Sequence, residues 1–250
     1  MMALIDALEA RDGIVCAVGA GGKKSVLYQL ALEHPGRFAL TATVHTTEFT
    51  DELGLQCIIA DDAGLRRQLR AADSSRSVAY ACPSSKPGRH AGVTPETIRA
   101  IHREGGFAAT FVKADGARMR WIKAPAANEP IVVPGADLVI PVVSARAIAE
   151  PLNERVAHRV DRVAAVTGVA PGERLSPEAV GRLLASGHGS LYRTAGGRVA
   201  PVINMVDNDD KEELAQAAAT AALAATSRFD RVVLCCLRRP ERPVVAVVTR

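Results

Sequence analysis

The sequence predicts an α/β fold with a mostly parallel sheet, and three observations lead to that prediction. Short apolar runs alternate with helical patterns along the 250 residues, as they do when each parallel strand is followed by a crossover helix. The apolar runs are continuous, which is typical of strands that helices cover on both faces. The chain is 48% hydrophobic and shows neither a long linker nor a repeat, so we expect a single domain over residues 1–250.

The predicted strands are the apolar runs themselves. They cover residues 13–18, 37–47, 56–60, 77–83, 108–116, 137–144, 201–206, 231–237 and 243–249. The last two runs flank a basic turn at 238–243, and we expect them to pair as an antiparallel hairpin at the edge of the sheet.

Helical periodicity and end signals predict the helices. They cover residues 24–32, 61–72, 94–106, 176–187 and 209–227, with an amphipathic helix at 1–13. Two of them begin with Ser or Thr followed by Pro, which favours a helix start, and end at Gly, which favours a helix stop. A helical pattern over 152–159 places Glu154 and His158 on one face. Two ligands are too few for a metal site, so this pair is expected to cap the helix or contact a partner.

Composition excludes several classes of function. The net charge is +4 with the basic residues spread along the chain, and aromatic residues make up 4%, too few for the stacking platforms of single-strand nucleic-acid binders. No apolar stretch approaches the roughly 20 residues that span a membrane, and the N-terminal residues lack a signal-peptide pattern. Five cysteines, an odd number, favour a reducing compartment. We therefore expect a cytoplasmic protein that binds neither nucleic acid nor membrane.

The most informative stretch follows the first predicted strand. A glycine-rich turn there leads into a helix, and such a turn points backbone N–H groups and a helix N-terminus at an anion. In a phosphate-binding loop, a lysine then reaches the β- and γ-phosphates, and a Ser or Thr hydroxyl binds Mg²⁺. The pattern predicts a three-layer fold of the P-loop NTPase type that binds ATP or GTP. The candidate nucleotide-binding residues of this stretch are Gly19, Ala20, Gly21, Gly22, Lys23, Lys24 and Ser25.

This loop departs from the strict pattern G-x-x-x-x-G-K-[ST] at two positions. With Gly22 and Lys23 as the Gly-Lys pair, Ala17 stands at the first glycine and Lys24 at the hydroxyl that binds Mg²⁺. Ser25, the next residue, is the candidate Mg²⁺ ligand in its place. The alternative is a tight strand-to-helix connection that binds no ligand.

Two further strand ends supply polar residues that a nucleotide site needs. Asp115 follows an apolar run and is a candidate Mg²⁺ ligand and, with Lys23, a candidate catalytic residue. An ordinary Asp-Gly turn is the alternative. Asn204 and Asp207 follow another run in a pattern like the guanine-reading Asn-Lys-x-Asp, with Met205 in place of the lysine. They are candidates for contacting the base, or else they cap the next helix.

Three loops are expected near the functional edge of the sheet. The segment 44–49 gathers His, Thr and Glu side chains, and long loops cover 83–93 and 116–135. Within the last loop, Lys123 has Glu129 nearby in the sequence and is a candidate to pair with the phosphate or with a partner's anion. The alternative is a surface ion pair that contributes little.

The order of these motifs resembles the accessory proteins of selenium-dependent molybdenum hydroxylases, the YqeC-like family. The resemblance rests on "VGAGGK", "ADG…KAPA..EP", "DLVI", "PL.E.VAHR" and "N.VD", and it covers about residues 13–210. Residues 113–130 are its most specific part. It implies a cytoplasmic P-loop protein that helps to mature a molybdenum hydroxylase, acting on its apoenzyme or its cofactor. The family usually has two threonines after Gly-Gly-Lys and an acid where Lys113 stands, so this chain departs from it at the presumed metal edge.

Three hypotheses follow for the function. In the first, NTP binding or slow hydrolysis acts as a switch, with Ser25 and Asp115 serving the Mg²⁺. In the second, a binding module holds a nucleotide or the phosphate end of the molybdenum cofactor without turnover, which Lys24 favours because an ammonium group cannot bind Mg²⁺. In the third, a kinase or nucleotidyltransferase acts on a cofactor precursor.

Overall fold

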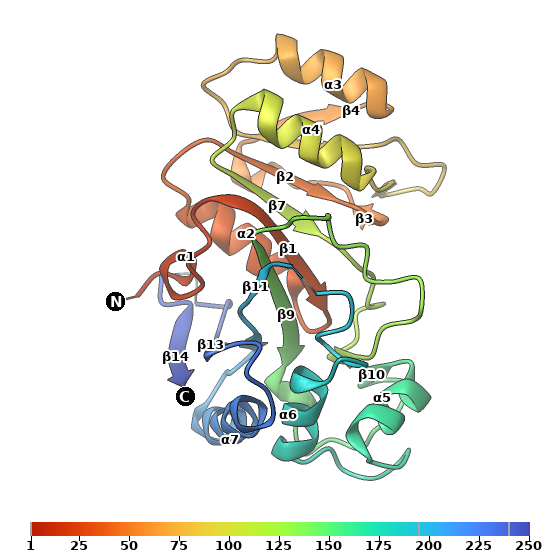
Figure 1. The fold of residues 1–250 in the computed structure, drawn as a ribbon, viewed down its shortest axis with the longest axis vertical. Helices are drawn as coiled ribbons and strands as arrows, with labels where there is room; N and C mark the ends of the chain where they lie inside the picture. Colours follow the sequence, from red (N-terminus) through yellow and green to blue (C-terminus); the bar gives the residue numbers. More distant parts are fainter. Residues whose placement is uncertain (1, 195, 240) are drawn as a thin grey trace.

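A computed structural model describes residues 2–194, 196–239 and 241–250 and confirms the predicted α/β fold. Within the described residues, ten strands form one sheet in the order β4-β5-β2-β7-β1-β9-β12-β13-β14, with β11 also paired to β9 (Figure 1). The strands are β1 (Gly13–Gly19), β2 (Phe38–Ala42), β4 (Gln56–Ile59), β5 (Val78–Ala81), β7 (Ala109–Lys113), β9 (Leu138–Ser144), β11 (Arg198–Val199), β12 (Val202–Asn204), β13 (Arg231–Cys235) and β14 (Val244–Thr249).

The strand pairs of this sheet are parallel except for β13 and β14, which form the predicted antiparallel hairpin at the edge. Pro240, which falls between those two strands in the sequence, lies outside the described residues. Strand β1 lies in the middle of the sheet, between β7 and β9. The segments that follow these three neighbours therefore meet at one edge of the sheet, which is where open α/β sheets bind ligands.

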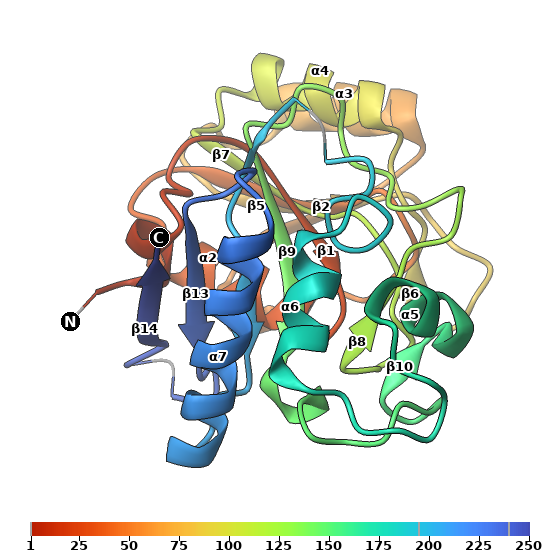
Figure 2. The same ribbon diagram turned by 60° about the horizontal axis from the view of Figure 1, so that its bottom comes forward.

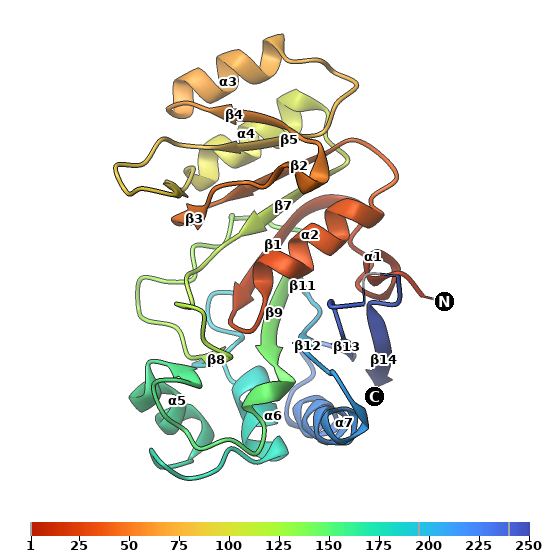
Figure 3. The same cartoon turned by 180° about the vertical axis from the view of Figure 1, so that it is seen from behind.

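Helices cover both faces of the sheet, consistent with a three-layer P-loop-like fold. Helices α1 and α2 lie on one face of the sheet (Figure 3), and their apolar side chains pack against it. On the other face, α3 and α4 cover one end of the sheet, and α6 and α7 lie side by side over the other end (Figure 1, Figure 2). The helices are α1 (Leu4–Ala7), α2 (Lys23–Glu33), α3 (Asp62–Ala71), α4 (Pro95–Gly105), α5 (Val160–Thr167), α6 (Pro177–Ala185) and α7 (Asp209–Ala225), with 3₁₀ helices η1 (Asp51–Leu53) and η2 (Ala145–Ala147).

Side-chain caps stabilise the starts of three predicted helices. The hydroxyl oxygens of Thr94 and Ser176 accept hydrogen bonds from the backbone three residues later, and Pro follows each of them at the first helical position. Asn208 caps α7 in the same way. These caps satisfy amide groups that have no acceptor within the helix.

Two of the predicted elements are much longer than the elements that form. The strand expected over 37–47 ends at Ala42, and only Thr46–Thr47 continues, as strand β3 of a separate antiparallel pair with β6 (Arg89–His90). The helix expected over 1–13 is confined to Leu4–Ala7, and Met1 lies outside the described residues. The positive φ of Glu9, 51°, turns the chain away from the helical path.

The helix expected over 152–159 does not form. Ala157–His158 is instead strand β10, which pairs with β8 (Ile122–Lys123), and α5 begins only at Val160. The Asn153 side chain accepts hydrogen bonds from the N–H groups of residues 155 and 156, at 2.9 and 3.2 Å, a turn that competes with helix formation. Glu154 and His158 therefore do not share a helical face.

No helix in the described residues has both the length and the apolar character needed to cross a membrane.

The centre of the core predicts a large effect on stability. Phe111 on β7 is fully buried, and its ring centroid lies 5.7 Å from that of Phe38 on the neighbouring strand β2. Replacing Phe111 with Ala is expected to lower the free energy of unfolding by about 3–5 kcal/mol, because it leaves a cavity in a packed core. Urea denaturation measures this, with Met119→Ala as the control, since Met119 is 94% exposed and its loss should change stability by less than about 0.5 kcal/mol. Equal effects of the two substitutions would contradict the assignment of this core.

Candidate functional site

The candidate site begins with the glycine turn between β1 and α2. Gly19, Gly21 and Gly22 have positive φ angles of 93°, 84° and 115°, which side chains disfavour. A Cβ atom at Gly22 would lie 2.4 Å from Nδ2 of Asn204, and one at Gly21 would lie 2.5 Å from the backbone N of Ser144. The close packing of the turn against the ends of β9 and β12 therefore requires glycine.

Helix α2 presents its N-terminus at this turn. The N–H group of Val26 donates to the oxygen of Gly22 at 3.0 Å, and the amides of residues 22–25 precede that first helical hydrogen bond. Such amides have no acceptor within their own helix and carry a partial positive charge. The turn is partly covered, because Gly21 donates its N–H to the oxygen of Arg120 at 3.0 Å.

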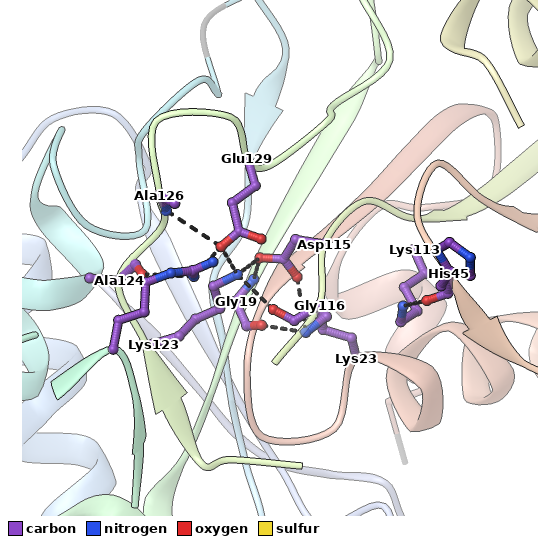
Figure 4. Close-up of polar contacts among 11 residues, drawn as sticks. Gly19, Lys23, His45, Lys113, Asp115, Gly116, Lys123, Ala124, Ala126 and Glu129 are labelled. Carbon is purple, nitrogen blue, oxygen red and sulfur yellow. Dashed lines mark hydrogen bonds and ion pairs between the residues drawn. The ribbon is translucent and has the colours of Figure 1, made fainter. Parts of the chain in front are cut away.

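A buried carboxylate lies beside this turn, between two lysines. Asp115, just after β7, is 1% exposed, Lys23 is 5% exposed and Lys123 is 3% exposed. The Lys23 Nζ lies 2.9 Å from Oδ1 of Asp115, and the Lys123 Nζ lies 2.9 Å from Oδ2 (Figure 4). The backbone N–H of Gly19 also donates to Oδ2, at 2.9 Å, and Lys23 donates to the oxygen of Gly19. Asp115 thus joins the glycine turn to the segment after β7.

The ion pairs continue away from the glycine turn. Lys123 donates to the oxygen of Gly116 at 2.7 Å and to Oε1 of Glu129 at 2.8 Å, and the guanidinium of Arg159 pairs with the same Glu129 oxygen. Lys123 pairs with Glu129, as the ion-pair alternative expects, but Lys123 is buried, so this pair does not lie at the surface. Three cationic and two anionic side chains leave the cluster with an excess positive charge.

Both carboxylates of the cluster stay ionised. Burial acts to raise the pKa of Asp115, but the charges of Lys23 and Lys123 outweigh it and hold that pKa below the ordinary value. The pKa of Glu129 is lowered in the same manner, with Lys123 and Arg159 outweighing burial. Burial lowers the pKa of Lys23, and the charge of Asp115 counteracts that effect.

Two more lysines lie on the other side of the glycine turn, and both contact the segment 45–48. Lys24, in the first turn of α2, donates from Nζ to Oγ1 of Thr47 at 3.0 Å and to the oxygen of Glu48 at 3.3 Å. Lys113, the last residue of β7, donates from Nζ to the oxygen of His45 at 2.8 Å (Figure 4). Burial lowers the pKa of Lys113 to about 8.

The two candidates for contacting a base are held by different partners. The Asn204 side chain is 2% exposed and donates from Nδ2 to the oxygen of Gly21 at 2.9 Å. Asp207 pairs with the guanidinium of Arg146, whose Nε lies 3.0 Å from Oδ2. Asn204 lines a cavity of about 130 Å³ beside the start of α2, where Ser25 and Arg146 are also found. In this arrangement Asn204 positions the glycine turn.

The two residues that the sequence proposes for Mg²⁺, Ser25 and Asp115, lie in different surroundings. Ser25 is exposed and lines the cavity beside Asn204, whereas both oxygens of buried Asp115 already contact lysines. Lys24 occupies the position of the usual hydroxyl ligand, and an ammonium group offers no lone pair. Over residues 2–194, 196–239 and 241–250, no three His, Cys, Asp or Glu side chains are grouped in a way that could hold a metal ion.

Some site residues were missed from the sequence. Arg159 pairs with Glu129. Arg159 lies in the quoted "PL.E.VAHR" motif, but the helix expected over 152–159 did not indicate that it belongs to the site. Arg146 follows β9 without any motif and pairs with Asp207. Arg120 contacts the glycine turn only through its backbone oxygen, which no sequence pattern reveals.

The central residues of the site lie within the part of the chain that a protein-family model matches. A sequence model described as "YqeC protein" matches residues 15–161, which include the glycine turn, Asp115, Lys123 and Arg159. The chain belongs to the YqeC family. It is 29% identical over 171 residues to the "Uncharacterized protein YqeC" of Escherichia coli (strain K12), a match that covers 67% of this chain. The match spans 65% of that relative, slightly less than two thirds of its length. Membership confirms the resemblance noted from the sequence, while Asn204 and Asp207 lie beyond the part that the family model matches.

The Asp115 cluster predicts a strong dependence of stability on Lys123. Replacing Lys123 with Met removes one of the two charges that compensate buried Asp115 and is expected to cost about 3–5 kcal/mol in the free energy of unfolding. Urea denaturation measures the loss, and the double variant with Asp115→Asn should recover part of it. Arg11→Ala serves as the control, because its ion pair with Asp6 is about half exposed and should contribute less than about 1 kcal/mol. A loss in Lys123→Met no greater than in the control would contradict the assignment.

Proposed function

We propose that this YqeC-family protein binds the phosphate groups of a purine nucleotide, ATP or GTP, at the turn 19–25. We propose further that nucleotide binding serves an accessory role in the maturation of a molybdenum hydroxylase, as the family resemblance implies. The observation that carries the nucleotide proposal is the position of Lys23. It is the first residue of a helix that follows a glycine turn, and it faces Asp115 at the end of the adjacent strand. This is the relation that a phosphate-binding loop and its neighbouring acidic strand require.

The chain's own groups would bind the phosphates in three ways. The amides of residues 22–25 point a partial positive charge out of the start of α2. Lys23 would exchange Asp115 for a phosphate oxygen, and Asp115 would keep Lys123 and the N–H of Gly19 as partners. Because Asp115 remains paired, this exchange avoids leaving a buried charge without compensation.

The proposal favours binding or slow turnover over rapid hydrolysis. Asp115 and Glu129 are the carboxylates of the cluster, and each contacts two cationic groups that lower its pKa. A carboxylate with a lowered pKa is a weak general base toward an attacking water. The charged cluster is therefore better suited to holding a phosphate than to activating water against it.

Titration with nucleotide tests this proposal. We expect ATP or GTP to bind the purified protein, and Lys23→Ala to weaken binding at least tenfold, which is about 1.4 kcal/mol. Calorimetry measures the affinity, and phosphate release is followed in the same samples. The matched control is Lys86→Ala, because Lys86 is exposed and lies in the predicted 83–93 loop. The affinity of Lys86→Ala for the nucleotide should equal that of the unchanged protein.

Two results would overturn the proposal. Absence of binding for both nucleotides would show that the glycine turn is only a tight connection. Equal affinities for Lys23→Ala and the unchanged protein would place the nucleotide elsewhere. The accessory role is tested with the same variant, because co-expression of a molybdenum hydroxylase with Lys23→Ala should yield less cofactor-loaded enzyme than co-expression with Lys86→Ala.

A further inference from the structure

Lys24 and Lys113 come from different elements and converge on one short segment. Lys24 lies in the first turn of α2, and Lys113 ends β7, yet both donate to residues 45–48. The same two lysines line one small cavity with Thr41 and Thr46. The rest of the lining is apolar or aromatic, and the two lysine side chains border this space between the start of α2 and the ends of β2 and β7.

We propose that Lys24 and Lys113 take the place of Mg²⁺ in this site, so that phosphate binding does not require a divalent metal. The two tethered ammonium groups hold the segment 45–48 beside the glycine turn and supply the positive charge that a metal ion would otherwise bring. This inference rests on the proposed phosphate site and specifies how that site works.

The position of Lys24 supports the proposal. It directly follows Lys23, where a phosphate-binding loop has the Ser or Thr that binds Mg²⁺. A lysine there has three donors and no acceptor, so it replaces the metal ligand with a cation. Its Nζ reaches Thr47 at 3.0 Å and lies 4.9 Å from the ring centroid of Tyr28, which fixes the ammonium group close to the helix start.

The surroundings of Lys113 support it as well. This residue lies on β7 two positions before Asp115, at the edge of the sheet where the glycine turn lies. Among the described residues, no carboxylate comes within 4.0 Å of the ammonium groups of Lys24 or Lys113. Both lysines donate hydrogen bonds to neutral oxygens, which leaves their charges without a directly paired carboxylate and suited to an anion.

The acidic side of the site agrees with this interpretation. Of the two candidate Mg²⁺ ligands, Ser25 lines a different cavity from Lys24 and Lys113, and Asp115 would keep its contact with Lys123 after Lys23 moves to a phosphate. A metal ion placed near Asp115 would also face the charges of Lys23 and Lys123. Like charges at such short distances repel strongly where burial keeps water away.

Calorimetric titration with ATP and with GTP, each in excess Mg²⁺ and each in EDTA, tests the inference. The affinity in EDTA should be no more than about threefold below the affinity in Mg²⁺, a difference of about 0.7 kcal/mol. Binding that weakens tenfold or more in EDTA overturns the inference and leaves the proposed function standing. No binding of either nucleotide under either condition overturns both.

Two variants separate the role of the lysines from general effects on the fold. Lys24→Thr, which restores the hydroxyl of the loop pattern, and Lys113→Gln should each lower affinity in EDTA at least tenfold. Lys24→Thr should regain affinity when Mg²⁺ is added. Lys86→Thr is the matched control and should change neither value. Unchanged EDTA affinity in both site variants, with thermal unfolding showing that they are folded, contradicts the proposal.

Hydrogen exchange gives a readout that does not depend on nucleotide. Amides of residues 45–48 should exchange faster in Lys24→Thr and in Lys113→Gln than in the unchanged protein, because each variant loses a tether to that segment. Lys23→Ala should leave their exchange unchanged, because the polar contacts of Lys23 go to Gly19 and Asp115. Equal exchange in all four proteins contradicts the tethering part of the proposal.

Discussion

The buried carboxylate of Asp115 is the constraint on which the site depends. A charge this far from water is tolerated only when it is paired and hydrogen-bonded, and here Lys23, Lys123 and the N–H of Gly19 all contact it. These partners come from the glycine turn, from helix α2 and from strand β8. One side chain therefore fixes the relative positions of three segments at the same edge of the sheet.

The ion pairs of the cluster extend from Asp115 toward α5. From Asp115 the contacts run through Lys123 and Glu129 to Arg159, immediately before α5. These contacts connect the glycine turn to the start of α5. The backbone oxygen of Arg120 accepts a hydrogen bond from the N–H of Gly21, which adds a second connection between the glycine turn and the segment 116–130.

The fold was largely predictable because its signals are local. Continuous apolar runs marked the parallel strands, and Thr94 and Ser176 with their following prolines marked helix starts. The turn at Asn153 was missed, because a side chain that bonds its own backbone leaves the apolar periodicity of a helix in place. The candidate site was predictable only in part. The sequence placed Lys23 and Asp115 at neighbouring strand ends, but the burial of Lys123 depends on long-range packing that no motif records.

A crystal structure with a bound nucleoside triphosphate, prepared in EDTA, tests the central claim most directly. The account predicts that the Nζ of Lys23 moves from Asp115 to a phosphate oxygen, while Lys123 stays on Asp115 and Lys24 and Lys113 face the phosphates. A triphosphate bound away from the glycine turn, with Lys23 still paired to Asp115, would contradict the account.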